Sequence, residues 1–511
     1  MVRRIALLVV LIIGFVAVLS AQETFTSLDG RITLTVPAGW EVEEDGGLIL
    51  LEDEDRNFIS IGLLSSDEIE RAQVYYADTL GEGLTADTLL QLLADVTPEI
   101  NANIESELGF SLALPGTNYE GPVEIAGLSG ASGAFGITPV LVLEAETGDF
   151  LLFNLDADEA VIDSVLEPLV TSIDIQPFSL DTNAYTTAIT PENAADLSLI
   201  TQYVFGGGAT RDIEVLPDGA SLVVGASGEA RHIEIATGAV LQVFDFDDAT
   251  VTALDLSADG SQVVGAAVYR DDRDLAIVRV WDAATGDTLA TITTTSDESA
   301  SLVRISPDGS LVGVVGGRLM VYDVATGDEV LLVEGERDAF AFNAAGTQMV
   351  AACPEAPGTV ACVYDLASGD VVTEIANPDN AFPFGYRSLA FFADTVLVGF
   401  SQFNGPADVV AFSAASGDPI FTAIGPENSD GLTAHEGAVT WIALNADGSL
   451  MVTAGDDESI RLWDVASGAG IAVLEGPHGS SIVNRAAFNP DGTLLFTTAN
   501  DGTLRVWAIG E

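Results

Sequence analysis

Two stretches near the end of the chain each combine a histidine, a threonine, an aspartate and a tryptophan. The members are His435, Thr453, Asp457 and Trp463 in the first set, and His478, Thr497, Asp501 and Trp507 in the second. A hydroxyl, an imidazole and a carboxylate can together activate a nucleophile. The same groups can instead satisfy one another's hydrogen bonds, because indole and imidazole nitrogens need partners once they are buried. The spacing matches in the two stretches, and this repetition favours a structural network over catalysis.

Both stretches belong to a longer internal repeat, and the fold of that repeat determines where their side chains lie. A turn signature of the Pro-Asp-Gly type alternates with a second signature, Ala-Thr-Gly or Ala-Ser-Gly, at intervals of about 40 to 50 residues. Apolar and β-branched runs between the signatures indicate strands, and the glycines supply the positive φ angles of tight hairpins. A repeat of this length with four strands per unit predicts a β-propeller.

The stretches LMVTAGDDESIRLWD and LLFTTANDGTLRVWA closely resemble WD repeats, and the resemblance extends over about residues 197–511. It recurs seven times in register, so we expect an all-β, seven-bladed WD-repeat propeller. The last unit lacks one strand, and the apolar run at 197–207 would complete it by closing the ring. A large ring at the tryptophan position of the repeat fills the gap between neighbouring sheets. That position is occupied by Ile233, Trp281, Tyr322, Tyr364, Phe412, Trp463 and Trp507.

In WD-repeat proteins, a buried relay links tryptophan, serine or threonine, histidine and aspartate. The resemblance therefore implies that the two four-residue sets are structural relays in blades six and seven. Blades one to five lack the corresponding histidine and are expected to depend on apolar packing. The chain also contains no G-x-S-x-G motif and, without lysine, no phosphate-binding G-x-x-x-x-G-K-[ST] loop. We therefore expect no enzymatic activity, no cofactor and no metal.

Long irregular segments point to a partner-binding face. They connect the second strand to the third, or one unit to the next, whereas the other turns are short and repetitive. These long segments are predicted at residues 267–276, 354–359, 377–387, 401–408 and 425–437. In a propeller, these long connections emerge on one face, which WD-repeat proteins commonly use to hold partners. Aromatic and arginine side chains are the usual interface anchors. Those on the long segments are Arg270, Arg273, Phe382, Phe384, Tyr386, Arg387 and Phe403. Phe382 and Phe384 have an alternative position, packed beneath their own loop.

The charge of the chain narrows the class of partner. Its 511 residues include 78 acidic and only 17 basic ones, all arginine, for a formal net charge of -61. Such a field repels phosphate backbones and anionic lipid headgroups, so nucleic acid and anionic membrane surfaces are disfavoured as partners. Solubility, or life in salty surroundings, accounts for the acidity without a specific cation-binding role. The sequence does not indicate an oligomeric state.

The N-terminus has the features of a secretory signal peptide, residues 1–21. Arg3 and Arg4 precede an apolar run from Ile5 to Leu19 and a small pair, Ser20-Ala21. Cleavage after Ala21 would release a secreted or periplasmic protein, and an uncleaved N-terminal anchor is the alternative. In such an oxidising compartment Cys353 and Cys362, which flank a Pro/Gly-rich turn, are expected to form a disulfide.

Residues 22–175 are expected to form a separate α+β domain. Alternating strands at its start are followed by helical patterns near 67–80 and 85–95, further strands and a closing helix. The stretch DGRITLTVPAGW and the closing helix resemble the PsbP-like family of secreted domains. Residues 176–196 are rich in Thr, Asn and Pro and indicate a linker to the propeller.

These observations predict a secreted or surface-held, non-enzymatic WD-repeat scaffold that binds a protein or peptide. The alternative is an extracytoplasmic hydrolase or lyase with an unrecognised site, since one fold can host many chemistries. A third possibility is a cation-dependent acidic protein of saline habitats.

Overall fold

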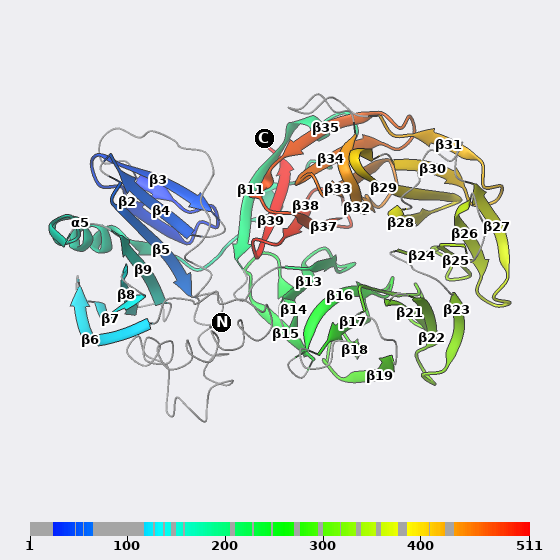
Figure 1. The fold of residues 1–511 in the computed structure, drawn as a ribbon, viewed down its shortest axis with the longest axis horizontal. Helices are drawn as coiled ribbons and strands as arrows, with labels where there is room; N and C mark the ends of the chain where they lie inside the picture. Colours follow the sequence, from blue (N-terminus) through cyan, green and yellow to red (C-terminus); the bar gives the residue numbers. More distant parts are fainter. Residues whose placement is uncertain are drawn as a thin grey trace. The chain divides into compact units, whose positions relative to one another are not determined.

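The computed structural model of the chain (Figure 1) divides into two compact units, residues 1–178 with 206–208 and residues 179–205 with 209–511. The predicted signal peptide and the predicted helices at 67–80 and 85–95 lie outside the described residues. The structure describes residues 24–45, 48–54, 56–64, 117–125, 128–135, 138–144, 150–156, 159–204, 210–226, 229–246, 249–269, 276–294, 300–316, 318–333, 339–353, 359–376, 386–407, 409–424 and 434–510.

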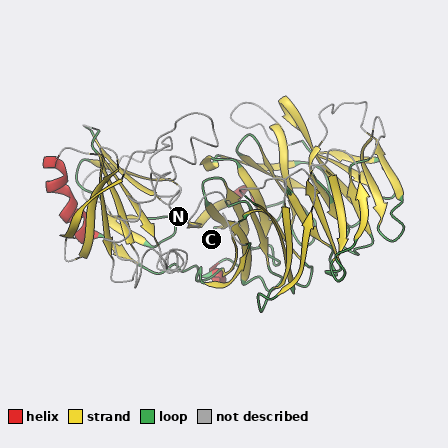
Figure 2. Ribbon diagram, turned by 60° about the horizontal axis from the view of Figure 1, so that its bottom comes forward, coloured by secondary structure: helices red, strands yellow, loops and turns green. Residues whose placement is uncertain are grey.

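The first unit is built on a seven-stranded antiparallel sheet in the order β3-β4-β5-β9-β8-β7-β6, and a three-stranded sheet has the order β1-β2-β10. Figure 2 shows α5 (Glu159–Ser172), the α-helix among the described residues of this unit. No helix among the described residues is long and apolar enough to cross a membrane. The strands are β1 Thr24–Thr26, β2 Ile32–Thr35, β3 Trp40–Asp45, β4 Leu48–Asp53, β5 Phe58–Leu64, β6 Thr117–Ile125, β7 Leu128–Phe135, β8 Thr138–Glu144, β9 Phe150–Asp156 and β10 Asp174–Ile175.

The core of the first unit follows from the periodicity of its sequence. Buried and more exposed residues alternate along β4, as in a strand with one face on the core. On α5, Leu166, Leu169 and Val170 form one apolar face and join the same buried cluster as Trp40. The α+β class that the sequence predicts for this part of the chain is confirmed.

Seven four-stranded antiparallel blades form the second unit, and Figure 1 shows them arranged around a ring. Blades one to four are β12–β15, β16–β19, β20–β23 and β24–β27, and blades five and six, β28–β31 and β32–β35, are joined because β29 also pairs with β32. Blade seven has the order β11-β39-β38-β37.

The strands of the first four blades are β12 Asp212–Val215, β13 Ser221–Ala226, β14 Glu229–Glu234, β15 Val240–Asp245, β16 Thr250–Leu256, β17 Gln262–Val268, β18 Ala276–Asp282, β19 Thr288–Thr294, β20 Leu302–Ile305, β21 Leu311–Gly316, β22 Arg318–Asp323, β23 Glu329–Val333, β24 Ala341–Phe342, β25 Gln348–Ala351, β26 Thr359–Asp365 and β27 Val371–Ala376. Those of the remaining blades are β11 Leu197–Val204, β28 Tyr386–Phe392, β29 Thr395–Ala407, β30 Val409–Ser413, β31 Pro419–Thr422, β32 His435–Leu444, β33 Leu450–Gly455, β34 Ser459–Asp464, β35 Gly470–Glu475, β37 Val483–Phe488, β38 Leu495–Ala499 and β39 Thr503–Ile509. Short elements outside the blades are β36 Pro477–Ser480 and the 3-10 helices η1 Thr182–Ala184 and η2 Ala194–Asp196.

The ring closes between the two ends of the propeller sequence. β11 pairs antiparallel with β39, from Leu197 opposite Ile509 to Val204 opposite Thr503. The first strand thereby completes the last blade, as the sequence predicts, and gives β39 a second pairing partner beside β38.

The tryptophan position of the repeat fills the gaps between blades. In blade two, the ring centroid of Trp281 lies 5.4 Å from that of Phe244 and 4.9 Å from that of Phe246, which belong to the end of blade one. All seven residues at this position are buried, namely Ile233, Trp281, Tyr322, Tyr364, Phe412, Trp463 and Trp507. The six aromatic residues of this set each share a buried cluster with residues of the preceding blade, so a large ring fills the gap between the two sheets there.

The predicted linker, residues 176–196, belongs to the second unit from residue 179 onward. The Leu180 N–H donates to the Ala236 carbonyl and the Ile189 N–H to the Gly492 carbonyl, both at 2.8 Å. Leu180 and Ile189 are also buried. These apolar side chains within a polar stretch attach the segment to the blades, so most of it is not a free connection.

The long segment predicted as a loop at 401–408 is mostly strand. β29 continues to Ala407 and pairs with β32, with Ser401 opposite Ala438 and Ala407 opposite His435. The prediction of a loop is wrong here because the start of β32 offers the extension a backbone partner that the local sequence does not reveal.

Candidate functional site

Blade six contains a chain of four hydrogen-bonded side chains. Trp463 Nε1 donates to Thr453 Oγ1 at 2.9 Å, and Thr453 Oγ1 lies 2.8 Å from His435 Nε2. The other ring nitrogen, Nδ1, lies 2.9 Å from Asp457 Oδ1. The Ser459 hydroxyl donates to the same carboxylate at 2.8 Å. His435 and Thr453 are fully buried, so their polar groups find partners inside the blade.

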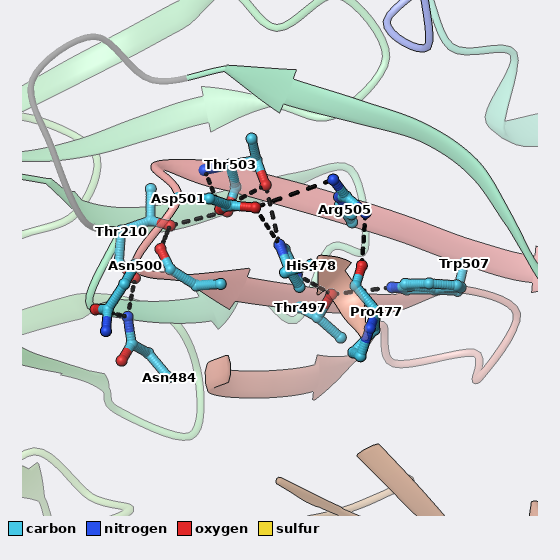
Figure 3. A network of polar contacts seen from close by, with 11 residues as sticks. Thr210, Pro477, His478, Asn484, Thr497, Asn500, Asp501, Thr503, Arg505 and Trp507 are labelled. Carbon is cyan, nitrogen blue, oxygen red and sulfur yellow. Dashed lines mark hydrogen bonds and ion pairs between the residues drawn. The ribbon is translucent and has the colours of Figure 1, made fainter. Parts of the chain in front are cut away.

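Blade seven repeats this arrangement, as Figure 3 shows. Trp507 Nε1 donates to Thr497 Oγ1 at 2.9 Å, and Thr497 Oγ1 lies 2.8 Å from His478 Nε2. His478 Nδ1 lies 3.0 Å from Asp501 Oδ2, and the Thr503 hydroxyl donates to Asp501 Oδ1 at 2.8 Å. The structure thus brings together the four members of each predicted set.

The donors determine the direction of each relay. Because an indole can only donate, the threonine accepts from it, and its own hydroxyl is free to donate a hydrogen bond to Nε2 of the histidine. In the tautomer that complements this order, Nδ1 carries the ring proton and donates to the aspartate. In blade seven, burial lowers the pKa of His478. Burial alone would raise the pKa of Asp501, but hydrogen bonds from His478 and Thr503 outweigh it and hold that pKa below its ordinary value.

The hydroxyls of these relays are not placed for nucleophilic attack. Thr453 and Thr497 are fully buried, and each already accepts a hydrogen bond from an indole N–H. A third hydroxyl–imidazole pair lies in blade one, where His232 Nε2 is 2.9 Å from Ser221 Oγ. There the carboxylate of Asp218 accepts from Ser221 at 3.1 Å rather than from the imidazole. That order differs from the hydroxyl–imidazole–carboxylate order that activates a serine.

The predicted partner-binding residues occupy several different environments. Tyr386 begins β28 and is only 8% exposed, so its ring is a core side chain and not a surface anchor. The next residue, Arg387, lies at a β-bulge between the buried residues Tyr386 and Ser388, and its side chain is exposed. Phe403 lies within β29. Four members of the set lie outside the described residues: Arg270, Arg273, Phe382 and Phe384.

A disulfide joins Cys353 to Cys362, with Cα atoms 5.1 Å apart. Cys362 lies in β26 and is paired with Ala351 of β25, two residues before Cys353. The bridge therefore closes the connection between the second and third strands of blade four, at the end of the blade where the long connections begin.

A second cluster of polar side chains lies on the first strands of several blades. The sequence motifs did not indicate this cluster. Arg304 in β20 and Arg485 in β37 lie over the indole of Trp441 in β32, with guanidinium carbons 4.7 Å and 4.3 Å from the ring centroid. First strands such as β28 and β37 lie toward the centre of the ring in Figure 1. Together with Arg387 of β28, these side chains line a cavity of about 190 Å³. We call Arg304, Arg387, Trp441 and Arg485 the central cluster.

Three carboxylates from blades one and two contact the central cluster. Arg485 Nε donates to Asp212 Oδ1 at 3.0 Å. Arg304 Nη1 lies 3.6 Å from both Glu214 Oε1 and Asp255 Oδ1. Burial raises the pKa of Asp255 to about 6 although Arg304 opposes it. Burial, with the charge of Asp255 next, also raises the pKa of Glu214 well above its ordinary value. Two carboxylates share one guanidinium here, so their ionisation is linked.

A register within the repeat marks these positions. In most repeat units, a glycine with positive φ lies in the turn between the first and second strands. Most residues of the site lie on the first strand, either seven or five residues before that glycine. These two positions are two residues apart, so their side chains lie on the same face of the strand. Comparing the repeat units at these two positions would have found most of the site. The residues seven before their turn glycine are Asp212, Trp441 and Arg485, and those five before it are Glu214, Asp255 and Arg304.

Two segments of the propeller match the model of a known protein family. Residues 427–464 and 470–508 match the family described as WD domain, G-beta repeat. These segments cover blade six and, apart from β11, blade seven, the two blades with complete relays. No curated protein matches the chain.

Proposed function

Because the second unit of this chain is a WD-repeat β-propeller, a fold that in general mediates protein–protein interactions, we propose that the protein is a non-enzymatic scaffold that binds a protein or peptide. It works outside the cytoplasmic membrane, secreted or surface-held. The binding face is the end of the ring where second strands connect to third strands and each blade connects to the next.

The asymmetry between the two faces of the ring carries this proposal. On the face of the short turns, the polar groups are satisfied within each turn. Between β16 and β17, Asp259 accepts from the Ser261 N–H at 2.9 Å and from the Ser257 hydroxyl at 2.8 Å. Asp308 repeats the pattern in blade three, accepting from Ser306 at 2.7 Å. Such turns leave few donors and acceptors for a partner, so the opposite face is favoured.

The burial of both relays supports the non-enzymatic part of the proposal. The alternative, an extracytoplasmic hydrolase or lyase, would draw on Glu214 and Asp255, whose pKa values are raised. The geometry gives Asp255 a structural role, because its second oxygen accepts from the backbone N–H of Ile305 in the next blade at 2.8 Å. Among the described residues, no group of three His, Cys, Asp or Glu side chains could hold a metal ion.

The disulfide between Cys353 and Cys362 supports the location, because disulfides persist in oxidising compartments outside the cytoplasm. The signal peptide at residues 1–21 and the likeness of the first unit to the PsbP-like family stay predictions from the sequence.

Partner capture tests the proposal. The chain without residues 1–21 is immobilised and exposed to native medium or periplasm, and the bound proteins are identified. A variant with segments 270–275 and 377–385 replaced by short Gly/Ser connections should retain at most about a tenth of the specific partner. A control with Asp328→Lys and Asp370→Lys, exposed on the short-turn face, should retain it fully. Equal capture by both variants, or loss only in the control, would place the interface elsewhere.

A further inference from the structure

We infer that the cavity at the centre of the propeller binds a single carboxylate, carried by an acidic side chain of a peptide partner, with Arg387 as its main contact. This inference rests on the proposed function and names the chemistry of the ligand.

Arg387 is the open cation of the central cluster. Its side chain is exposed and lines the cavity, and no hydrogen bond or ion pair joins it to any other described residue. Arg304 and Arg485 differ, since both stack on Trp441 and both contact carboxylates. A guanidinium binds a carboxylate through two parallel hydrogen bonds, and Arg387 has these donors available.

The clustering of arginines at this cavity is unusual for so acidic a protein and supports a site for an anion. The chain has 17 basic residues against 78 acidic ones, yet three arginines line one cavity of about 190 Å³. A solvated surface in such a protein gives no reason to gather cations at one place.

The size of the cavity selects the kind of ligand. Sites for drug-sized molecules measure roughly 300–1,000 Å³, whereas this cavity of about 190 Å³ has room for one side chain. Trp441, Phe340 and Leu389 provide apolar walls for its methylene groups. At physiological salt the screening length is about 8 Å, so the acidic surface opposes a lone carboxylate less than a polyanion.

A peptide library provides a probe that requires no knowledge of the natural partner. Random heptapeptides displayed on phage are selected on the full chain without residues 1–21. The selected peptides should share an Asp or Glu at one position. Synthetic copies with Gln or Asn at that position should bind about tenfold more weakly or worse, measured by calorimetry and by the fluorescence of the half-exposed Trp441.

Substitutions on the protein complete the test. Arg387→Gln should weaken the acidic peptides by about tenfold or more, and Arg387→Lys should restore part of the affinity. Arg318→Gln, which changes an arginine at the start of β22 outside the cavity, is the matched control and should bind normally. Circular dichroism verifies that the variants are folded.

Four outcomes would overturn the inference: no acidic position among the selected peptides, equal binding of the Gln copies, tighter binding of phosphoserine copies, or unchanged binding by Arg387→Gln. Free glutarate that binds as tightly as the peptides would assign the cavity to a small acid instead of a peptide. If loop replacement abolishes capture of the natural partner while Arg387→Gln has no effect on the peptides, the scaffold function stands and the carboxylate site does not.

Discussion

Arg485 and Asp212 link the last blade of the ring to the first, with the guanidinium Nε donating to the carboxylate Oδ1 at 3.0 Å. Asp212 is fully buried, and its other oxygen accepts from the Leu254 N–H of blade two at 2.9 Å. One carboxylate therefore connects three blades, which adds a side-chain link to the backbone pairing of β11 with β39.

Replacing Asp212 with alanine should lower the free energy of unfolding by about 2–4 kcal/mol, because the Arg485 guanidinium and the Leu254 N–H lose a buried acceptor. Urea unfolding followed by circular dichroism measures the change. Asp328→Ala, at an exposed turn position, is the control and should cost less than about 0.5 kcal/mol. Similar losses in the two variants would show that the link contributes nothing specific.

Thr453→Val and Thr497→Val should each lower the free energy of unfolding by about 2–4 kcal/mol. The substitution keeps the shape of the side chain but leaves a buried indole N–H and a buried imidazole nitrogen without their partner. Thr291→Val, at an exposed position of β19, is the matched control and should be nearly neutral. A neutral effect at position 453 or 497 would mean that the relay of that blade is dispensable for stability.

The free energy of unfolding of the Asp255→Asn variant should increase relative to that of the unsubstituted protein as the pH rises from about 4 to 6. The folded-state pKa of Asp255, about 6, lies above its ordinary value of 3.8. The folded state therefore binds more protons in this window, and stability is lost as the pH rises through it. Asparagine does not ionise, and its amide oxygen can still accept from Ile305. The difference in unfolding free energy should grow by about 1–3 kcal/mol and then level off; a difference independent of pH would contradict the shift.

His478 should act in the opposite direction. Burial lowers its folded-state pKa below the ordinary value of 6.5, so the folded state binds fewer protons than the unfolded state just below that pH. Its contribution to stability is complete above pH 6.5 and is lost as the pH falls through the folded-state pKa. The cost of His478→Gln should consequently be largest near pH 8 and shrink in acid. Unfolding free energies between pH 5 and pH 8 measure this, and a cost that grows in acid would oppose it.

Reducing the disulfide between Cys353 and Cys362 should lower the free energy of unfolding by about 2–3 kcal/mol, because the bridge closes a short loop in the unfolded chain. The unfolding midpoint is compared with and without a reductant. A double variant, Cys353→Ser with Cys362→Ser, should match the reduced protein and no longer respond to reductant. A response that persists in the double variant would show that the reductant acts elsewhere.

Local patterns in the sequence were sufficient to predict the repeat, the seven blades and the two relays. Each of these depends on spacing within one unit or between adjacent units, and Thr453, Asp457 and Trp463 lie close enough in sequence to be visible together as a motif. Closure by β11 was also predictable, because the last unit lacks a strand and an unpaired strand precedes the first.

The tertiary structure alone decided which surfaces carry chemistry. Tyr386 and Arg387 are neighbours in sequence, yet one is a core ring and the other an exposed cation. Arg304, Trp441 and Arg485 lie in blades three, six and seven, and they meet because closing the ring brings the inward faces of distant strands together. Sequence periodicity determines which face of its own strand a side chain occupies. Contact between side chains of blades so far apart in the chain depends on the curvature of the whole ring.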